Sequence, residues 1–363
     1  MIGYRMTRLL KWILALALLL GLGTAWIYAD YRHFVGTPLA LASEERIIQV
    51  PDGATASAVV DLLYDAHIID SKWKMMLVLR TSGFAHKIQP GTVILTPDMT
   101  PADLPQLLAK VGKYARLSVQ ILNGMNLYEI AARLKSQRIA DEVVFIELAT
   151  NPAVAAESGI PAKSFEGYLA AGAYTFEPGV STRDVLGEMH ERWRKQWQKV
   201  IDENRGAYEQ RRRYLSDHAL VTLASIVEKE AILDRERPII ARVFYNRLQK
   251  MMKLQSDPTC VYPPLYKGEK PTPARCKDAQ NPYSTYMIPA LPPGPIAIPS
   301  VASLLAVIRP YTGPDGGQIL YFVARNDGSR AHYFSKTYAE HQVAVDYFLK
   351  GKKKKPQGTV QPK

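Results

Sequence analysis

Two glutamates in the stretch "LASIVEKEAILDRERP" (residues 223–238) are the side chains in this sequence best suited to acid–base chemistry. The stretch predicts a helix, and a helix turns by about 100° per residue, so Glu228 and Glu230 point in different directions. Leu223 and Val227 mark an apolar arc on this helix. Glu230 lies within the arc and Glu228 lies on the opposite side. We therefore expect Glu230 to face the packed surface and Glu228 to face water.

A carboxyl group on a packed face has two explanations. The first is a boundary glutamate that pairs with an arginine, such as Arg242 or Arg247. The second is an acid on the floor of a cleft, where partial burial raises its pKa and keeps it protonated near neutral pH. Such an acid can donate a proton to a leaving oxygen. The helical periodicity does not decide between the two.

A second polar motif, "LQSDPT" (254–259), follows the predicted helices. Gln255, Asp257 and Thr259 occupy alternate positions, so in an extended strand their side chains would all point to one face. This spacing suits a polar ligand. The alternative is an Asx-type turn, in which Asp257 satisfies backbone groups ahead of Pro258.

The N-terminal segment decides on which side of a membrane these residues lie. The stretch "WILALALLLGLGTAWIYA" (12–29) has no charged residue, and at about 1.5 Å per residue it nearly crosses a hydrocarbon core of about 30 Å. Arg5, Arg8 and Lys11 precede it, so the positive-inside rule puts residues 1–11 in the cytoplasm and everything after residue 30 outside. The alternative is a cleaved signal peptide. No A-x-A cleavage site follows the apolar run, so we predict an uncleaved, single-pass anchor.

The remaining pattern of helices and strands predicts an α+β fold. A short spacer precedes a small unit of short strands and helices. A larger unit of mixed helices and strands follows, with a basic end. The predicted parts are a cytoplasmic N-terminus (1–11), a transmembrane helix (12–29), a spacer (30–44), a small α+β unit (45–113), a larger unit (114–349) and a disordered tail (350–363).

Composition narrows the function classes. With 47% apolar residues in 363, the chain is not a disordered protein. Lys and Arg number 46 against 34 Asp and Glu, a net charge of +12, and part of this excess lies in "KGKKKKP" (350–356). That run is a solvated end, or else it meets a polyanion such as nucleic acid, membrane lipid or an acidic wall polymer. The sequence has no zinc pattern, phosphate loop or nucleotide fingerprint, so we expect no metal, no organic cofactor and no nucleic acid.

The two cysteines, Cys260 and Cys276, lie in a proline-rich segment of the predicted exported part. Disulfides persist in that compartment. A disulfide that closes this segment and a pair of free thiols are both consistent with the spacing, because the sequence does not give the separation of the two Cα atoms.

Several motifs, in this order, resemble the MltG/YceG-like family of membrane-anchored endolytic murein transglycosylases. They are "ASIVEKE", "ERPIIARVFYNRL", "LQSDPT", "LPPGPIAIP" and "YFVARNDGSRAHYFSKTYAEH" (321–341). The resemblance runs from the anchor to about residue 349 and is strong over 223–341. In that family the second glutamate of the E-K-E trio is catalytic, which corresponds to Glu230 here. The helical-face argument had selected the same residue independently.

The resemblance implies cleavage of the bond between N-acetylmuramic acid and N-acetylglucosamine within glycan strands of peptidoglycan. The C6 hydroxyl attacks C1 and leaves a 1,6-anhydro end, with Glu230 acting first as acid and then as base. A second carboxylate is not needed, because no water must be activated. The resemblance also implies a LysM-like wall-binding module at 45–113 and a catalytic domain at 114–349. The catalytic domain would lie outside the cell inner membrane, in the periplasm, where peptidoglycan synthases are possible partners.

With the family in view, Gln255, Asp257 and Thr259 are interpreted as cleft residues. Tyr283 and Tyr286 either stack on sugar rings or are buried with bonded hydroxyls. Further candidate contacts with the sugar are Tyr168 and His332, the latter equally consistent with a structural role.

Two other functions stay open. If Asp257 is a second catalytic carboxylate, the protein is a muramidase-type hydrolase. A non-catalytic, membrane-tethered peptidoglycan-binding scaffold is the other alternative. One departure favours it, because "EGYLAAGAY" has Ala170, Ala171 and Gly172 where the family shows F-P-D.

Overall fold

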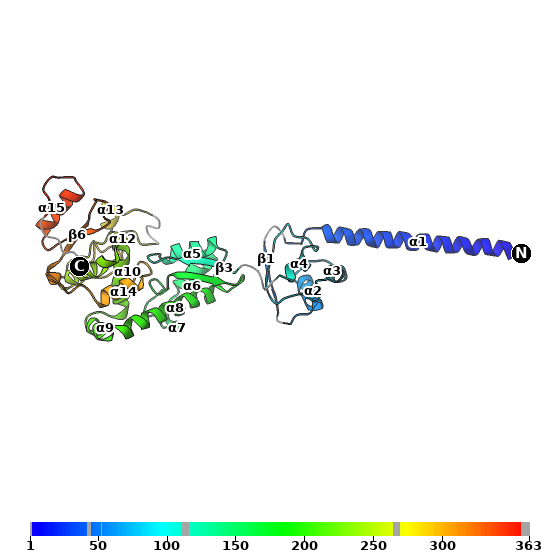
Figure 1. Cartoon of the computed structure of the whole chain (residues 1–363), viewed down its shortest axis with the longest axis horizontal. Coiled ribbons are helices and arrows are strands. Elements are labelled where there is room, and N and C mark those ends of the chain that lie inside the picture. The colour runs from blue at the N-terminus through cyan, green and yellow to red at the C-terminus, as the bar shows by residue number, and fades with distance from the viewer. Residues whose placement is uncertain (1, 42–44, 52, 111–115, 264–268, 357–363) are drawn as a thin grey trace. The chain divides into compact units, whose positions relative to one another are not determined.

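The computed structural model describes residues 2–41, 45–51, 53–110, 116–263 and 269–356. The chain divides into two compact units. The first comprises residues up to Arg116 together with Glu177–Gly179, and the second comprises Leu117–Phe176 and the residues from Val180 onward. Each unit mixes helices and strands, which confirms the predicted α+β class (Figure 1).

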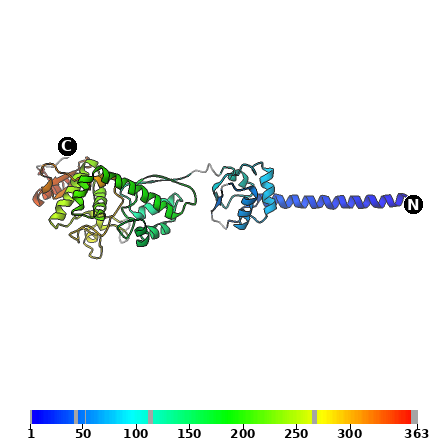
Figure 2. The ribbon, with the colours of Figure 1, turned by 90° about the horizontal axis from the view of Figure 1, so that it is seen from below.

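The first unit begins with α1 (Ile2–Gly36), which is one continuous helix in both views (Figure 1, Figure 2). Its segment Leu10–Gly36 is long and apolar enough to cross a membrane, and no residue of its most apolar window is buried. The helix extends past residue 29, so the first part of the predicted spacer 30–44 is helical. Near its end, Phe34 is buried in the core of the unit and Asp30 pairs with Lys74 at 2.8 Å.

The rest of the first unit packs three helices against a two-stranded antiparallel sheet. Strand β1 pairs with β2 so that Ile48 lies opposite Val93. Apolar side chains from the sheet and the helices form one core. The elements are β1 (Arg46–Val50), α2 (Ala56–Asp65), α3 (Lys72–Thr81), β2 (Gly91–Leu95) and α4 (Leu104–Leu108).

The second unit starts with an antiparallel strand pair and a set of helices. Strand β3 (Leu117–Ile121) pairs with β4 (Gly172–Phe176), which places Val119 opposite Tyr174. Ser181 caps the long helix α8 through a hydrogen bond to the backbone of Asp184. The helices of this part are α5 (Leu127–Ser136), α6 (Glu142–Ala149), α7 (Pro152–Glu157), α8 (Thr182–Glu203) and α9 (Arg205–Arg212).

Helix α10 (Asp217–Glu230) lies at the centre of the second unit, against α11 (Arg237–Gln249) and α14 (Val301–Ile308). Every residue from Leu220 to Val227 is buried. A helix that is buried on all sides has no face left for water. The single apolar arc predicted from the sequence is therefore too narrow a description of α10.

Short elements complete the second unit. Strand β5 (Tyr321–Ala324) pairs with β6 (His332–Ser335), and α15 (Tyr338–Phe348) packs against both. Two single-turn helices, α12 (Asp257–Cys260) and α13 (Pro273–Cys276), lie beside each other, and α12 also contacts α10. Two short 3-10 turns are η2 (Asp234–Glu236) and η3 (Gly316–Gln318).

Candidate active site

Glu230 is the last residue of α10, and its carboxyl group is held by a serine hydroxyl. The Oγ of Ser256 donates a hydrogen bond of 2.5 Å to Oε1 of Glu230. Ser256 is only 1% exposed, whereas Glu230 is half-buried. Within the described ranges, no lysine or arginine nitrogen lies at ion-pair distance from Glu230. The carboxyl group therefore has a hydroxyl partner and no neutralising cation.

The pKa of Glu230 is raised from 4.5 to about 7, and burial of the carboxyl group is the largest cause. The hydrogen bond from Ser256 opposes this rise because it stabilises the carboxylate. The negative charge of Asp257 raises the pKa further, and the positive charge of Arg247 lowers it. Near neutral pH both forms of Glu230 are populated, which suits a group that gives and then takes a proton.

Glu228 is buried, so the prediction that it faces water is wrong. Its side chain is 7% exposed and pairs with Arg237 at 3.0 Å. It also accepts hydrogen bonds from the hydroxyls of Ser300, at 2.5 Å, and Ser303, at 2.8 Å. Helix α14 begins next to these serines and covers the side of α10 that the sequence pattern left open.

The arginines named as partners for Glu230 bind backbone carbonyls instead. Arg242 donates to the carbonyl oxygen of Tyr311 at 2.6 Å. Arg247 is buried and donates to the carbonyls of Leu254, at 2.6 Å, and Leu320, at 2.7 Å. The explanation of Glu230 as an arginine-paired boundary residue is therefore wrong for these two arginines, and the arginine-paired glutamate is Glu228.

The motif 254–259 is not extended, so its alternate residues do not share a face. Residues from Asp257 onward form the helical turn α12, with Pro258 in its first turn, where proline is well tolerated. Gln255 is exposed, with a left-handed φ of 51°. Thr259 is fully buried and donates to the carbonyl of Ser256 at 2.6 Å, so its placement in a cleft is wrong.

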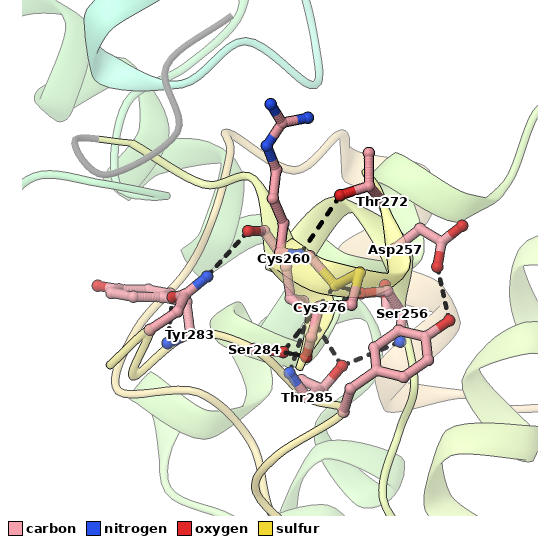
Figure 3. The surroundings of a disulfide bond; sticks show 12 residues. Ser256, Asp257, Cys260, Thr272, Cys276, Tyr283, Ser284 and Thr285 are labelled. Atoms are coloured by element: carbon pink, nitrogen blue, oxygen red, sulfur yellow. Dashed lines mark hydrogen bonds between the residues drawn. A yellow bond between two sulfur atoms is a disulfide. The ribbon is translucent and has the colours of Figure 1, made fainter. Parts of the chain in front are cut away.

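A polar cluster next to a disulfide fixes the backbone of Ser256. The amide of Ser256 donates to the hydroxyl of Thr285 at 2.9 Å, and the hydroxyls of Thr285 and Thr259 lie 2.9 Å apart. Cys260, at the end of α12, forms a disulfide with Cys276 (Figure 3). The structure thus contains the paired form of the two cysteines.

Of the three tyrosines predicted to contact sugar, two are half-buried and one is buried in the core. Tyr286 is half-buried and donates to Asp257 Oδ1 at 2.6 Å, and Asp257 is exposed. Tyr283 is half-buried, with its ring 4.5 Å from that of Tyr262. Tyr168 is 2% exposed, and its hydroxyl lies 2.8 Å from Nδ1 of His218. Tyr168 is a core residue, and its predicted contact with a sugar is wrong.

His332 has a structural role. Its Nδ1 lies 2.7 Å from Glu236 Oε2, and its amide donates to the other oxygen of Glu236 at 2.9 Å. Its ring packs against the rings of Phe322 and Phe334. These contacts of the amide and Nδ1 favour the structural interpretation of His332, and its contact with substrate stays a prediction.

Sequence reasoning missed two buried polar residues of the second unit. One is Ser256. It lies in the motif "LQSDPT", but it falls between the alternate positions that the sequence argument selected. The other is Glu166, 2% exposed, whose Oε2 accepts from the amide of Leu127 at 3.1 Å and the hydroxyl of Tyr262 at 2.7 Å. Burial raises the pKa of Glu166 to about 7. Glu166 stands in the sequence "SFEGYL", but no pattern in that stretch indicates that its carboxyl group is buried.

Two cavities lie in the second unit, and one of them is lined by a residue of α10. One, of about 400 Å³, is lined by Lys229 and Pro258, the sequence neighbours of Glu230 and Asp257. The other, of about 460 Å³, is lined by residues that include Ala171 and Gly172 of the departure from the family pattern. Ala170 is buried, and its amide donates to the carbonyl of Met189 at 3.1 Å.

Fold and site together define a class: an α+β protein with one helix able to cross a membrane and a carboxylic acid whose pKa is raised to near neutrality. The model of the YceG-like family matches residues 48–347, and the chain belongs to this family.

Named relatives agree with this assignment. The endolytic murein transglycosylase of Bacillus subtilis (strain 168) is 30% identical over 328 residues, which cover 85% of this chain and 86% of that protein. The endolytic murein transglycosylase of Streptococcus pneumoniae serotype 2 (strain D39 / NCTC 7466) is 30% identical over 174 residues, 46% of this chain and 29% of that longer protein. The 2.6 Å crystal structure of the putative yceG-like protein lmo1499 from Listeria monocytogenes superposes with a TM-score of 0.54 at 27% identity, covering 83% of this chain and 99% of that one.

Proposed function

We propose that this protein is an endolytic murein transglycosylase in which Glu230 is the general acid and then the general base. The relative from Bacillus subtilis bears that name and matches 85% of this chain. The observation that carries the assignment of Glu230 is the setting of its carboxyl group, half-buried, hydrogen-bonded by Ser256 and without an ion-pair partner among the described residues. A structural glutamate would resemble Glu228, which is neutralised by Arg237.

In the proposed first step, protonated Glu230 donates its proton to the glycosidic oxygen, and the bond from that oxygen to C1 of N-acetylmuramic acid breaks. In the second, the C6 hydroxyl oxygen of the same sugar bonds to C1, and the Glu230 carboxylate takes the hydroxyl proton. The acid is regenerated and no water is consumed. Proton transfer by a positioned group of this kind accelerates a reaction by roughly 10²–10⁴.

The hydrogen bond from Ser256 assigns the two carboxyl oxygens different tasks. Oε1 accepts from the serine hydroxyl in both protonation states. The acidic proton of Glu230 is then carried by Oε2, which is the oxygen that must face the glycosidic bond. Ser256 itself exchanges no proton with the substrate.

A hydrolase is the second candidate, because the charge of Asp257 acts on Glu230 and its side chain is exposed. Two carboxyl groups flanking a bond can activate water or form a covalent intermediate. The hydroxyl of Tyr286 already occupies one oxygen of Asp257. We assign Asp257 the role of an electrostatic neighbour that keeps Glu230 protonated.

We also propose that α1 crosses the inner membrane with the N-terminus in the cytoplasm and the second unit outside. The disulfide supports this orientation, because disulfides persist outside the cytoplasm. Residues 45–113 then form a LysM-like wall-binding module, 114–349 the catalytic domain, and peptidoglycan synthases the neighbouring partners.

The test is product analysis by mass after the full chain, in detergent, acts on isolated murein. We expect internal cleavage with 1,6-anhydro ends, lost in Glu230→Gln. Reducing ends that disappear in Asp257→Asn would establish the hydrolase. Binding to murein without any fragments would establish the non-catalytic scaffold.

A further inference from the structure

We propose that a further cavity of the second unit, between α9 and the end of α14, is an anion site that binds the free carboxylate at the end of a short peptide. The cavity has a volume of about 540 Å³ and is lined by residues of α9 and by the segment 308–313. Helices α9 and α14 are in contact (Figure 1). Murein carries short peptides with such an end, and naming murein as the source rests on the proposed function.

This cavity is separate from the candidate active site. Ser300, which precedes the first residue of α14, donates to Glu228, two positions before Glu230. Ile308, the last residue of α14, lines the cavity. Eight helical residues span about 12 Å. The cavity therefore lies at the end of α14 that is opposite to the glutamates of α10.

Positive charge gathers at this cavity without a counter-charge. Arg211 and Arg309 line it, and its lining contains no aspartate or glutamate. Arg242 joins them, because it donates to the carbonyl of the lining residue Tyr311 at 2.6 Å. Burial of Arg242 and the positive charge of Arg211 both lower the pKa of Arg242. In the part of the chain that the structure describes, none of these three guanidinium groups lies at ion-pair distance from a carboxylate. A bound anion would supply the missing charge.

The two cavities described above differ from this one in their charge. The first pairs Lys229 with Glu129 in its lining, and the second pairs Arg237 with Asp234. Their linings therefore contain both signs of charge. The preference for an anion is a property of the cavity beside α9 and does not follow merely from the positive net charge of the chain.

The other interpretation of Arg211 is a purely structural one. Its guanidinium lies 5.3 Å from the ring centre of Tyr245, and its Nε donates to the carbonyl of Ile308 at 3.4 Å. These contacts position the group but bring no negative charge to it. A guanidinium has five N–H donors, so most of them stay available to a ligand.

The lining suits a carboxylate at the end of a peptide better than a bare inorganic anion. A guanidinium matches a carboxylate with two parallel hydrogen bonds. The rest of the lining combines small apolar surfaces with side chains that can pair with peptide groups, and it includes Ala207, Ile308, Pro310, Gln210 and Thr312. The volume falls in the range of ordinary ligand pockets. A murein strand held in the active site would keep its peptides at a high local concentration, which favours murein over the end of another protein.

The test of the site measures binding of N-acetyl-D-alanyl-D-alanine to the full chain in detergent, by calorimetry. The C-terminal amide of this peptide should bind at least tenfold more weakly, because it lacks the charge. Arg211→Gln and Arg309→Gln should each weaken binding of the free acid to a similar degree. Arg213→Gln is the matched control, since Arg213 is exposed and does not line the cavity.

Equal binding of acid and amide, an equal loss in Arg213→Gln, or no measurable binding by the wild type would each overturn the site. Inorganic phosphate that binds as tightly as the peptide, and with the same dependence on Arg211, would overturn the assignment to a peptide. Arg309 is exposed, so Arg309→Gln decides the matter if the melting temperature of Arg211→Gln shows that this variant is unfolded.

A second measurement tests murein as the source of the carboxylate. Arg211→Gln should raise KM for murein with little change in kcat, and an excess of the free peptide should raise the apparent KM of the wild type only. A wild type that binds the peptide but keeps its KM in the presence of the peptide would assign the site to another ligand, such as the C-terminus of a protein. Anhydro ends without peptide binding would overturn the anion site alone. Peptide binding without anhydro ends would overturn the proposed function alone.

Discussion

Ser256 donates a hydrogen bond of 2.5 Å to Glu230, and these two residues come from different elements of the second unit. Glu230 ends α10, and Ser256 precedes α12. The position of the serine depends on the hydroxyls of Thr259 and Thr285, which bond to its carbonyl and its amide. The geometry of the proposed acid is therefore set by a segment 26 positions further along the chain.

Replacing Ser256 by alanine should raise the pKa of Glu230, because the hydrogen bond that stabilises the carboxylate is lost. In the pH profile of kcat/KM, the limb that falls as the acid loses its proton should move to higher pH. The rate at the optimum should fall by about tenfold to 100-fold, because the carboxyl group is no longer held in place.

Ser225→Ala is the matched control for this variant. Ser225 is also a buried serine, and its hydroxyl bonds within α10 and to the amide of Ile296. A limb that moves equally in both variants, or in neither, would show that Ser256 does not act on Glu230.

Glu228→Ala should destabilise the fold by about 3–5 kcal/mol, because it removes the buried partner of the Arg237 guanidinium and leaves it only the exposed Asp234. An exposed glutamate on a helix would cost less than about 0.5 kcal/mol. Urea unfolding of the full chain in detergent measures the difference. The double variant Glu228→Leu with Arg237→Met should recover much of the loss, and a small effect of Glu228→Ala would contradict the buried pair.

The contrast between Glu228 and Glu230 shows what the sequence could predict. Apolar periodicity located the helix and one of its buried faces, because both follow from local sequence. The burial of Glu228 depends on Ser300 and Ser303, more than 70 positions away, so no local pattern contains it. Whether Glu230 pairs with an arginine also depends on residues far away in the sequence. Periodicity alone could therefore not decide it.

The errors at Tyr168 and Thr259 have a related cause. Residue type indicates that a tyrosine or a threonine can bind a sugar, but burial decides whether it does, and burial is set by the fold. For Thr259 a local signal existed. Pro258 favours the first turn of a helix, which argues against the extended strand that the alternation required.

Removing the disulfide should lower stability and activity together. Cys260 and Cys276 are 16 positions apart, and closing a loop of that length stabilises a fold by about 3 kcal/mol. The double variant Cys260→Ser with Cys276→Ser should therefore melt at a lower temperature. Its activity should fall as well, because α12 carries Thr259, which holds the carbonyl of Ser256.

Dithiothreitol provides the control for the disulfide. Reduction adds two electrons and two protons to the bond, while the reagent is oxidised to its cyclic disulfide. Reduced wild type should behave like the double variant, and the double variant should not respond to the reagent. A wild type that keeps its melting temperature after complete reduction, verified by thiol titration, would contradict this account.

Glu230→Gln should abolish cleavage and at the same time stabilise the fold at alkaline pH. The pKa of Glu230 is 4.5 for the free side chain and about 7 in the fold, so the folded state holds its proton more tightly. Stability from this group is complete below about pH 4.5 and is lost as pH rises through 7. One pKa unit corresponds to about 1.4 kcal/mol, so the loss reaches at most about 3.5 kcal/mol.

Glutamine does not ionise, and its side-chain oxygen can still accept the hydrogen bond of Ser256. The free energy of unfolding of the variant, relative to wild type, should therefore increase between pH 5 and pH 8, when measured by urea titration in detergent. Ionisation of Glu166 affects both proteins equally and cancels in the comparison. A difference that stays constant with pH would mean that Glu230 is not desolvated in the fold, and the basis for its role as an acid near neutral pH would be lost.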